Sequence, residues 1–322
     1  MSSLRKVPQL SFKSMTSGTA QDRQNFIDNF YRGLKEYGFV VIKDHPLSQP
    51  LIDKAYAYSR KLFALSPEEK KQYDGSEFGG QRGLTAFGTE HAKDSTAPDL
   101  KEFYHVGREN FRPTASAEIE KKQQLCRNIW PEEKGEMIGF KETFLQIYDA
   151  LEEMGVTLFR TIALALGEKP DAFESMVDNG DSILRLIHYP PIKGDFPEGS
   201  VRSAAHTDIN LMTILMGATS EGLELLDRDG KWLPVEAGHS DLVVDSGDTL
   251  SRLSNEVIPS TVHRVVNPKD PTQERYSMPF FFHANKSAVL KCLDSCRGEK
   301  ELYPEITAGD FVLQRLKDIG LY

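Results

Sequence analysis

Two histidines and an aspartate carry the most specific chemical signal in this chain. His206 and Asp208 are separated by one residue in the stretch Ala-His-Thr-Asp, just before the apolar run 211–216. On a strand or strand end, alternate side chains point to the same face, so this imidazole and carboxylate are aimed at one point. His263 lies far downstream in the β-branched run Val-His-Arg-Val-Val. Two imidazoles and one carboxylate bind a metal on one triangular face, which suits a non-heme Fe(II) that must also hold a co-substrate and O2.

A second pair of polar residues follows the distal histidine. Arg275 and Ser277 are again two residues apart, so they share a face of the next predicted strand. A guanidinium fork beside a hydroxyl is a good receptor for a carboxylate. A His-x-Asp tripeptide alone is common, and a lone arginine and serine are more often solvated. Here the His-x-Asp pair, the distal histidine and the Arg-x-Ser pair follow one another along the chain. Together they favour a metal site with a carboxylate receptor beside it.

These residues resemble the motifs of the isopenicillin N synthase-like branch of the Fe(II)/2-oxoglutarate-dependent oxygenases. The resemblance spans nearly the whole chain. It implies an α+β fold in which a double-stranded β-helix, or jelly roll, is flanked by N-terminal helices and a C-terminal helix. The matching features are His206-x-Asp208, His263-Arg264-Val265, Arg275-x-Ser277, Tyr189-Pro190-Pro191, Ser246-Gly247-Asp248 and Leu253-Ser254-Asn255.

The same resemblance implies roles for these residues. The two histidines and Asp208 would hold Fe(II), and 2-oxoglutarate would be the co-substrate, with its distal carboxylate on Arg275 and Ser277. Tyr189 matches a position that helps bind 2-oxoglutarate or substrate. The implied reaction couples 2-oxoglutarate decarboxylation and O2 to hydroxylation, desaturation or ring closure of a small metabolite.

Candidate substrate contacts are less specific. Arg185 lies among isoleucines in the predicted strand 182–189. If its face is inside, the buried cation needs a charged partner and could hold an anionic group of the substrate, as arginines on this strand do in cephalosporin-forming relatives. If the other face is inside, Arg185 is solvated, and both alternatives stay open. Further candidates are Arg82, Phe103 and His105 over the site's mouth, and Phe282 in an aromatic run that would shield the site.

Hydrophobic periodicity divides the chain into helical and strand-rich parts. Apolar residues at helical spacing predict a long scaffold helix over 141–166, and short strands with turn signals predict an antiparallel barrel or jelly roll. We expect one oxygenase domain over 1–322, with an N-terminal α/β part (1–130), a catalytic core (181–285) and a C-terminal helix (305–322).

Composition limits the partners. The 322 residues carry a net charge of −9 without a long basic run, which disfavours nucleic acid and anionic membranes. The three cysteines form no framework and are typical of reduced thiols, and the N-terminus lacks a signal-peptide stretch. We therefore expect a cytoplasmic enzyme whose partners are O2 and a small, carboxylated metabolite or peptide.

Three alternatives remain open at this point. An isopenicillin N synthase-type Fe(II) oxidase shares the fold and the Arg-x-Ser pair but omits 2-oxoglutarate. A non-catalytic metal-binding barrel would leave Arg275 and Ser277 without a purpose. A zinc hydrolase would need a carboxylate base near bound water, and the sequence offers none at a fixed spacing.

Overall fold

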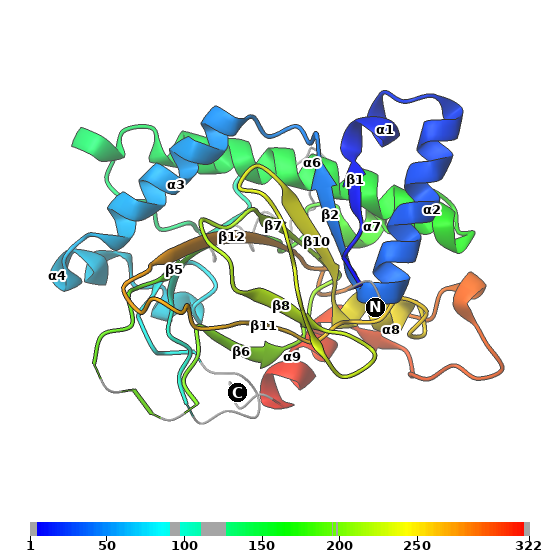
Figure 1. Cartoon of the computed structure of the whole chain (residues 1–322). Helices are drawn as coiled ribbons and strands as arrows, with labels where there is room; N and C mark the ends of the chain where they lie inside the picture. Colours follow the sequence, from blue (N-terminus) through cyan, green and yellow to red (C-terminus); the bar gives the residue numbers. More distant parts are fainter. Residues whose placement is uncertain (1–4, 91–96, 111–126, 195, 198, 319–322) are drawn as a thin grey trace.

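Two β-sheets form the centre of the protein in the computed structural model (Figure 1). The structure describes residues 5–90, 97–110, 127–194, 196–197 and 199–318. The larger sheet has the strand order β1-β2-β10-β7-β12-β5-β4-β3 and the smaller sheet the order β6-β11-β8-β9. Among the described strands of these sheets, only β1 and β2 pair in parallel. This is the mixed α+β fold with a jelly-roll core that the sequence predicts.

The strands are short. The larger sheet contains β1 (Gln9–Ser11), β2 (Phe39–Lys43), β3 (Gly83–Thr85), β4 (Glu102–Gly107), β5 (Ile183–Tyr189), β7 (Met212–Met216), β10 (Leu242–Ser246) and β12 (Arg275–Phe282). The smaller sheet contains β6 (Ser203–His206), β8 (Leu223–Leu226), β9 (Trp232–Pro234) and β11 (His263–Val265). A separate hairpin pairs β13 (Val289–Leu290) with β14 (Ile306–Thr307).

Helices cover the outside of the larger sheet. They are α2 (Ala20–Tyr37), α3 (Gln49–Phe63) and α6 (Phe140–Leu166), with the shorter α1 (Phe12–Thr16) next to α2, α4 (Pro67–Lys70) after α3 and α7 (Glu174–Val177) next to α6. The remaining two, α8 (Asp248–Leu253) and α9 (Ala308–Asp318), contact the hairpin of β13 and β14. Capping boxes at Thr19 and Ser66 satisfy the free amides at the starts of α2 and α4. Gly38 ends α2 in the left-handed conformation (φ 69°), which glycine adopts without a Cβ penalty.

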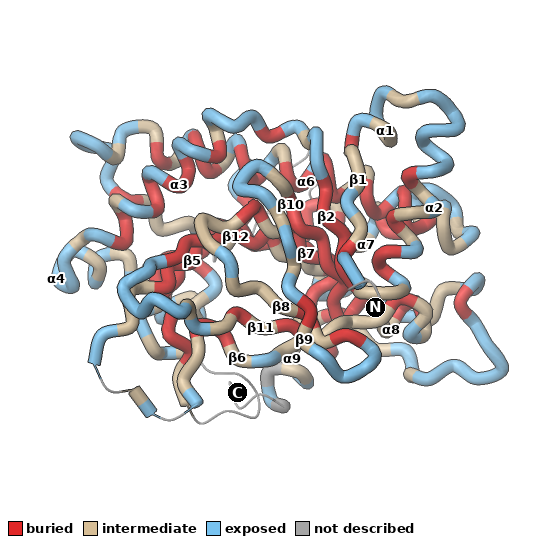
Figure 2. Tube along the Cα trace, viewed as in Figure 1, coloured by how far each residue is buried: buried red, intermediate tan, exposed pale blue. Residues whose placement is uncertain are grey.

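The two faces of β12 have different roles. Phe280 and Phe282 point outward to α6, where their rings contact Tyr148 (4.8 Å between centroids) and Phe159 (5.3 Å). A Cβ at Gly155 of α6 would lie 2.0 Å from the Phe282 ring, so glycine lets the helix approach the sheet. The long helix is therefore scaffold, as predicted, and Figure 2 shows the buried residues gathered on the strands and on the inner sides of the helices.

Some boundaries differ from expectation. The N-terminal strands extend both edges of the larger sheet, with β1 and β2 at one end and β3 and β4 at the other, because their backbones pair with β10 and β5. The Ser-Gly-Asp turn after β10 leads into α8, a short helix that the sequence pattern does not predict. The tail helix is present as α9, but residues 319–322 and Cys126 lie outside the described part of the chain.

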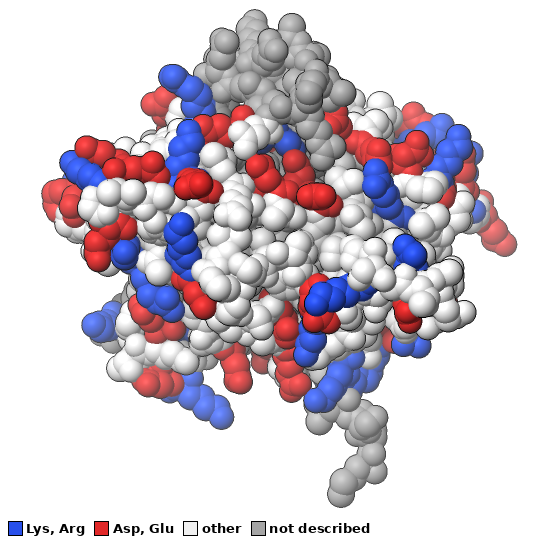
Figure 3. All heavy atoms as spheres, turned by 90° about the horizontal axis from the view of Figure 1, so that it is seen from above, with Lys and Arg blue, Asp and Glu red and all other residues white. Residues whose placement is uncertain are grey.

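No helix in the described segments is long and apolar enough to cross a membrane. On the face seen in Figure 3, acidic and basic side chains are interspersed over the surface.

Candidate metal and co-substrate site

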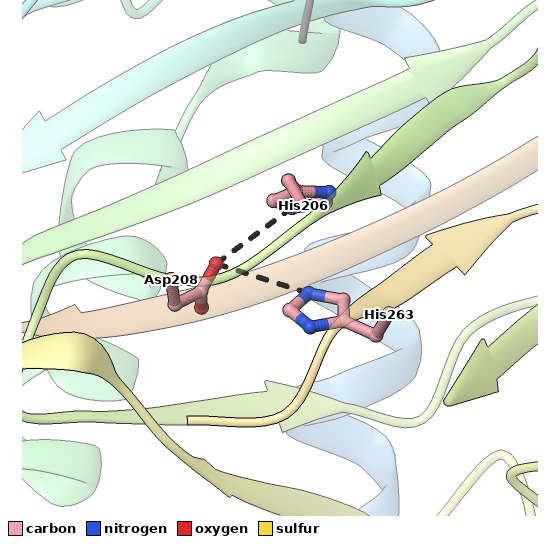
Figure 4. Close-up of side chains that lie close together, drawn as sticks. All are labelled: His206, Asp208 and His263. Carbon is pink, nitrogen blue, oxygen red and sulfur yellow. Dashed lines mark ion pairs between the residues drawn. The ribbon is translucent and has the colours of Figure 1, made fainter. Parts of the chain in front are cut away.

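His206, Asp208 and His263 come together between the sheets (Figure 4). His206 ends β6, Asp208 lies in the loop after it, and His263 begins β11, directly opposite His206 in the strand pairing. One ligand atom from each residue lies within 4.8 Å of the others. The Nε2 atoms of His206 and His263 are 3.7 Å and 3.8 Å from Asp208 Oδ1. The predicted convergence is therefore present.

Backbone carbonyls orient both imidazoles. His206 Nδ1 is 2.8 Å from the Ala204 carbonyl oxygen, and His263 Nδ1 is 3.2 Å from that of Thr261. A carbonyl oxygen can only accept, so each Nδ1 must carry the proton and donate it. In the neutral ring, Nε2 is then the nitrogen with the free lone pair, and it faces Asp208, which is the tautomer that a metal requires. Burial, and then the neighbouring His263, lower the pKa of His206 to about 4, which keeps this imidazole neutral.

A hydroxyl and a second acid surround Asp208. Burial alone would raise the pKa of the Asp208 carboxyl, but the two histidines and the Thr213 hydroxyl, which donates to Oδ2, hold it below its ordinary value. Asp245 on β10 lies opposite Thr213 on β7 and is buried beside this carboxylate. Burial, and then Asp208, raise the pKa of Asp245 well above its usual range. Neither Thr213 nor Asp245 was singled out from the sequence, because only strand pairing brings them to the triad.

The larger sheet supplies a cationic end to the same cavity, which measures about 70 Å³. Arg275, Ser277 and Tyr189 all line it, together with the three triad residues. Arg275 is 2 % exposed; its Nη1 donates to Ser277 Oγ (3.1 Å) and its Nε to the Ser220 carbonyl (3.1 Å). Among the described residues, no carboxylate forms an ion pair with Arg275. A buried guanidinium without a counter-ion fits the distal carboxylate of a dicarboxylic keto acid.

Arg185 lies on the cavity face of β5, which decides between the two orientations that the sequence left open. Its guanidinium lies 4.1 Å from the centroid of the Phe103 ring and 5.1 Å from that of Phe281. It also forms an ion pair with Glu90 (3.3 Å), whose pKa is held far below its ordinary value despite burial, by Arg185 and Lys101.

His105 fixes the orientation of this arginine. Its Nδ1 lies 2.7 Å from the Gly80 carbonyl oxygen, and its Nε2 accepts a hydrogen bond from Arg185 Nε (2.6 Å). Burial, and then the nearby Arg185, lower the pKa of His105 well below its usual value. His105 and Phe103 thus contact Arg185 and support it from behind.

Two predicted substrate contacts lie elsewhere. Arg82 is buried against Gly107 of β4, where a Cβ would collide with its guanidinium, and it is not among the residues that line the cavity. Phe282 packs on α6, and Phe281 takes the cavity position instead. Strand alternation explains the second difference, since Phe281 shares the face of Arg275 and Ser277 whereas Phe282 does not.

Comparison with known proteins agrees with this geometry. The model of the 2OG-Fe(II) oxygenase superfamily matches residues 180–284, and the model of the non-haem dioxygenase N-terminal region, described for morphine synthesis, matches residues 7–133. The chain belongs to the Fe(II)/2-oxoglutarate oxygenase superfamily, in its isopenicillin N synthase-like branch, and is a Fe(II)/2-oxoglutarate-dependent dioxygenase.

Individual relatives are similar over almost their full length. A 2-oxoglutarate-Fe(II) type oxidoreductase, hxnY of Emericella nidulans, is 30% identical over 95% of this chain and 88% of its own. The crystal structure of a 2OG-Fe(II) oxygenase family protein from Caulobacter crescentus is 40% identical, with a TM-score of 0.83, over 99% of this chain and 100% of that one. A full-length Neurospora crassa protein in complex with alpha-KG is 30% identical, with a TM-score of 0.84, over 96% and 95% of the two chains.

Proposed function

We propose that His206, Asp208 and His263 are the iron ligands of this dioxygenase, and that Arg275 and Ser277 hold the distal carboxylate of 2-oxoglutarate. The support is the convergence of two imidazole nitrogens and one carboxylate oxygen in a cavity that also contains an uncompensated guanidinium. When bound, the Fe(II) centre and 2-oxoglutarate supply the O2-dependent oxidation of a C–H bond. Tyr189, beside Arg275, would orient the co-substrate, and Phe281 and Ile187 would keep water from the reacting carbon.

An anaerobic titration tests this assignment of residues. Addition of Fe(II) and then 2-oxoglutarate to the apoprotein should give the weak visible charge-transfer band of the chelate. Asp208→Asn should lose Fe(II) and the band together, whereas Arg275→Gln should keep Fe(II) and need much more 2-oxoglutarate. A band of wild-type strength and affinity in both variants would refute the assignment.

We further propose that the primary substrate is a small, neutral, planar ring with polar edges. The observation that carries this proposal is that the two cations of the cavity other than Arg275 are already paired. Arg185 is bound to Glu90, and Lys101 lies 2.7 Å from both Glu90 and Asp99, so neither is left to neutralise a substrate carboxylate. The paired guanidinium, stacked near Phe103 and Phe281, offers instead a flat surface with hydrogen-bond donors at its edge.

A structural relative supports this class. The same Neurospora crassa protein has also been crystallised with alpha-KG and thymine, a complex that is 29% identical to this chain with a TM-score of 0.84, and with alpha-KG and 5-formyluracil. These ligands are neutral rings of the proposed kind. The carboxylated substrate expected from the sequence is therefore the second candidate, and 27% identity to the proline hydroxylase buaE of Petromyces alliaceus favours it.

Substrate-dependent release of succinate from 2-oxoglutarate separates the two candidates. We expect thymine or another neutral nucleobase to accelerate succinate formation, with a matching oxidised product, and proline and other carboxylated compounds to leave it at the background rate. The opposite ranking would replace the neutral ring with an anionic substrate. It would also require Arg185 to exchange Glu90 for that substrate.

Domain organisation, location and partners complete the proposal. We propose a single oxygenase unit over 1–322, in which the N-terminal α/β part, the catalytic core and the C-terminal helix act together. A cytoplasmic location and the lack of a nucleic-acid or membrane partner stay predictions from the sequence.

A further inference from the structure

A second arginine at the cationic end of the cavity has no role in the assignment above. Arg202 directly precedes β6 and is only 1 % exposed, among the largest fully buried side chains. Its Nη2 donates to the carbonyl oxygen of Gln273, but Nε and Nη1 are buried without a hydrogen-bond partner. Within the described segments no carboxylate lies in ion-pair distance of Arg202. A buried cation with two unused donors is expensive unless an anion is brought near it.

The surroundings of Arg202 identify where that anion would be. Its guanidinium carbon lies 5.9 Å from the centroid of the Tyr189 ring, and that of Arg275 lies 5.1 Å from the same centroid. Tyr189 is also the strand partner of Arg275 across β5 and β12. Gln273, which Arg202 binds, comes two residues before Arg275. Arg202 is thus tied to both elements that form the co-substrate end of the cavity.

The strand geometry separates Arg202 from the metal end. It lies four residues before His206, which corresponds to about 13 Å along an extended strand. Burial, and then the like charge of Arg275, lower the pKa of Arg202 to about 10, which still leaves it a cation at neutral pH. Both guanidinium groups therefore lie near the Tyr189 ring, Arg275 in the cavity lining and Arg202 outside it, and no carboxylate of the described residues forms an ion pair with either.

We propose that Arg202 is a positioning residue for the co-substrate, which makes the site selective for a dicarboxylate. The inference rests on the proposed role of Arg275. Arg202 does not line the cavity; it acts from behind Tyr189 and Gln273, adding positive potential where the distal carboxylate binds and fixing the backbone that carries Arg275. A keto acid that lacks this carboxylate gains nothing from Arg202.

Glutarate is the first probe, because it has both carboxylates and no keto group and can be studied without metal. Binding to the full-length metal-free protein can be followed by calorimetry or by the rise in melting temperature. Arg202→Gln should weaken glutarate binding about tenfold, because the positive potential behind the distal carboxylate is lost, and Arg202→Lys should recover most of the affinity. Arg264→Gln is the matched control, because Arg264 on β11 is already paired with Glu224 and stacked on Trp232.

The second probe compares keto acids with Fe(II) under anaerobic conditions. Arg202→Gln should weaken 2-oxoglutarate by about the same factor as glutarate and leave 2-oxopentanoate, which has a methyl group in place of the distal carboxylate, unchanged. Equal weakening of both keto acids, or of glutarate by Arg202→Gln and Arg202→Lys alike, would overturn the proposal in favour of a purely structural arginine.

The outcome for Arg275→Gln distinguishes this inference from the proposed function. If Arg275→Gln abolishes glutarate binding and Arg202→Gln binds it as wild type, Arg202 has no part in selectivity and the co-substrate assignment stands. If Arg275→Gln also binds glutarate normally, the assignment itself fails. If Arg202→Gln does not fold, NMR of the wild-type protein with 15Nε-labelled arginine tests the inference. The Arg202 resonance is assigned by its loss in Arg202→Lys and should shift when glutarate is added. An unmoved signal would contradict the inference.

Discussion

The metal end of the cavity and the end that contains Arg185 hold their polar groups in different ways. At the metal end, His206 and His263 are each oriented by a carbonyl only two residues earlier in the chain. At the other end, Arg185 is held by His105 and Glu90, which are 80 and 95 residues away. The comparison teaches that local sequence can encode the orientation of the metal-binding histidines, whereas the orientation of Arg185 depends on distant partners.

The strongest test of this contrast removes a metal ligand. His263→Ala should lower Fe(II) affinity by well over the roughly 100-fold that loss of a group merely orienting a ligand costs, because one of three donor atoms is gone. Fe(II) binding by calorimetry and 2-oxoglutarate turnover should fall together. His239→Ala is the control, since this half-exposed histidine contacts Asp53 and Tyr56 away from the cavity. Retained Fe(II) affinity in His263→Ala would show that the triad is not the iron site.

The two neighbouring phenylalanines of β12 give the next largest effect. Phe282→Ala should destabilise the protein by about 3–5 kcal/mol, because it opens a cavity against α6. Phe281→Ala, on the cavity side, should cost less stability and should alter substrate-stimulated succinate formation. Urea unfolding and turnover of both variants provide the comparison. A larger loss of stability in Phe281→Ala than in Phe282→Ala would contradict the assignment of the two faces.

The period of strands explains which of these site residues could be predicted from the sequence. The period of two along strands was enough to place His206 with Asp208 and Arg275 with Ser277. Applied two periods beyond Ser277, it would have chosen Phe281 over Phe282 for the cavity. The β-strands themselves were predictable because turn residues and β-branched runs alternate clearly between 182 and 282.

The rest depended on pairings that the sequence does not display. Lys101, which directly precedes β4, comes close to Arg185 and shares its partner Glu90 because β4 lies beside β5. Arg202 lies just before the four-residue strand β6, so strand periodicity does not show which way its side chain points. Its partner Gln273 lies 71 residues later, in the connection between β11 and β12. Long-range contacts of this kind follow from the fold, so the substrate surface could not be predicted before the structure.

A smaller loss of Fe(II) affinity is expected when the hydroxyl that contacts the Asp208 carboxylate is removed. Thr213→Val removes the hydroxyl that donates to Asp208 Oδ2 and leaves the Asn210 amide without its acceptor. Fe(II) affinity should fall about tenfold, because the carboxylate loses the group that orients it. Thr249→Val is the matched control: its buried hydroxyl binds the Ile209 carbonyl in the adjacent loop but not Asp208. Equal Fe(II) affinity in the two variants would remove Thr213 from the site.

The smallest effect concerns the support of Arg185. The pKa of His105 is lowered well below its ordinary value by burial and by Arg185, so the folded state binds fewer protons than the unfolded state below about pH 6.5. Stability from the neutral imidazole is thus complete above that pH and is lost as the pH falls toward the folded-state pKa, by up to about 1.4 kcal/mol per pH unit.

His105→Gln keeps a donor for Gly80 and an acceptor for Arg185 without a titrating ring. Urea unfolding at pH 7.5 and 5.5 should therefore show a smaller acid-induced loss in His105→Gln than in wild type. Because the other buried histidines are present in both proteins, they cancel in this difference, and an identical loss would mean that His105 accepts a proton without disturbing Arg185.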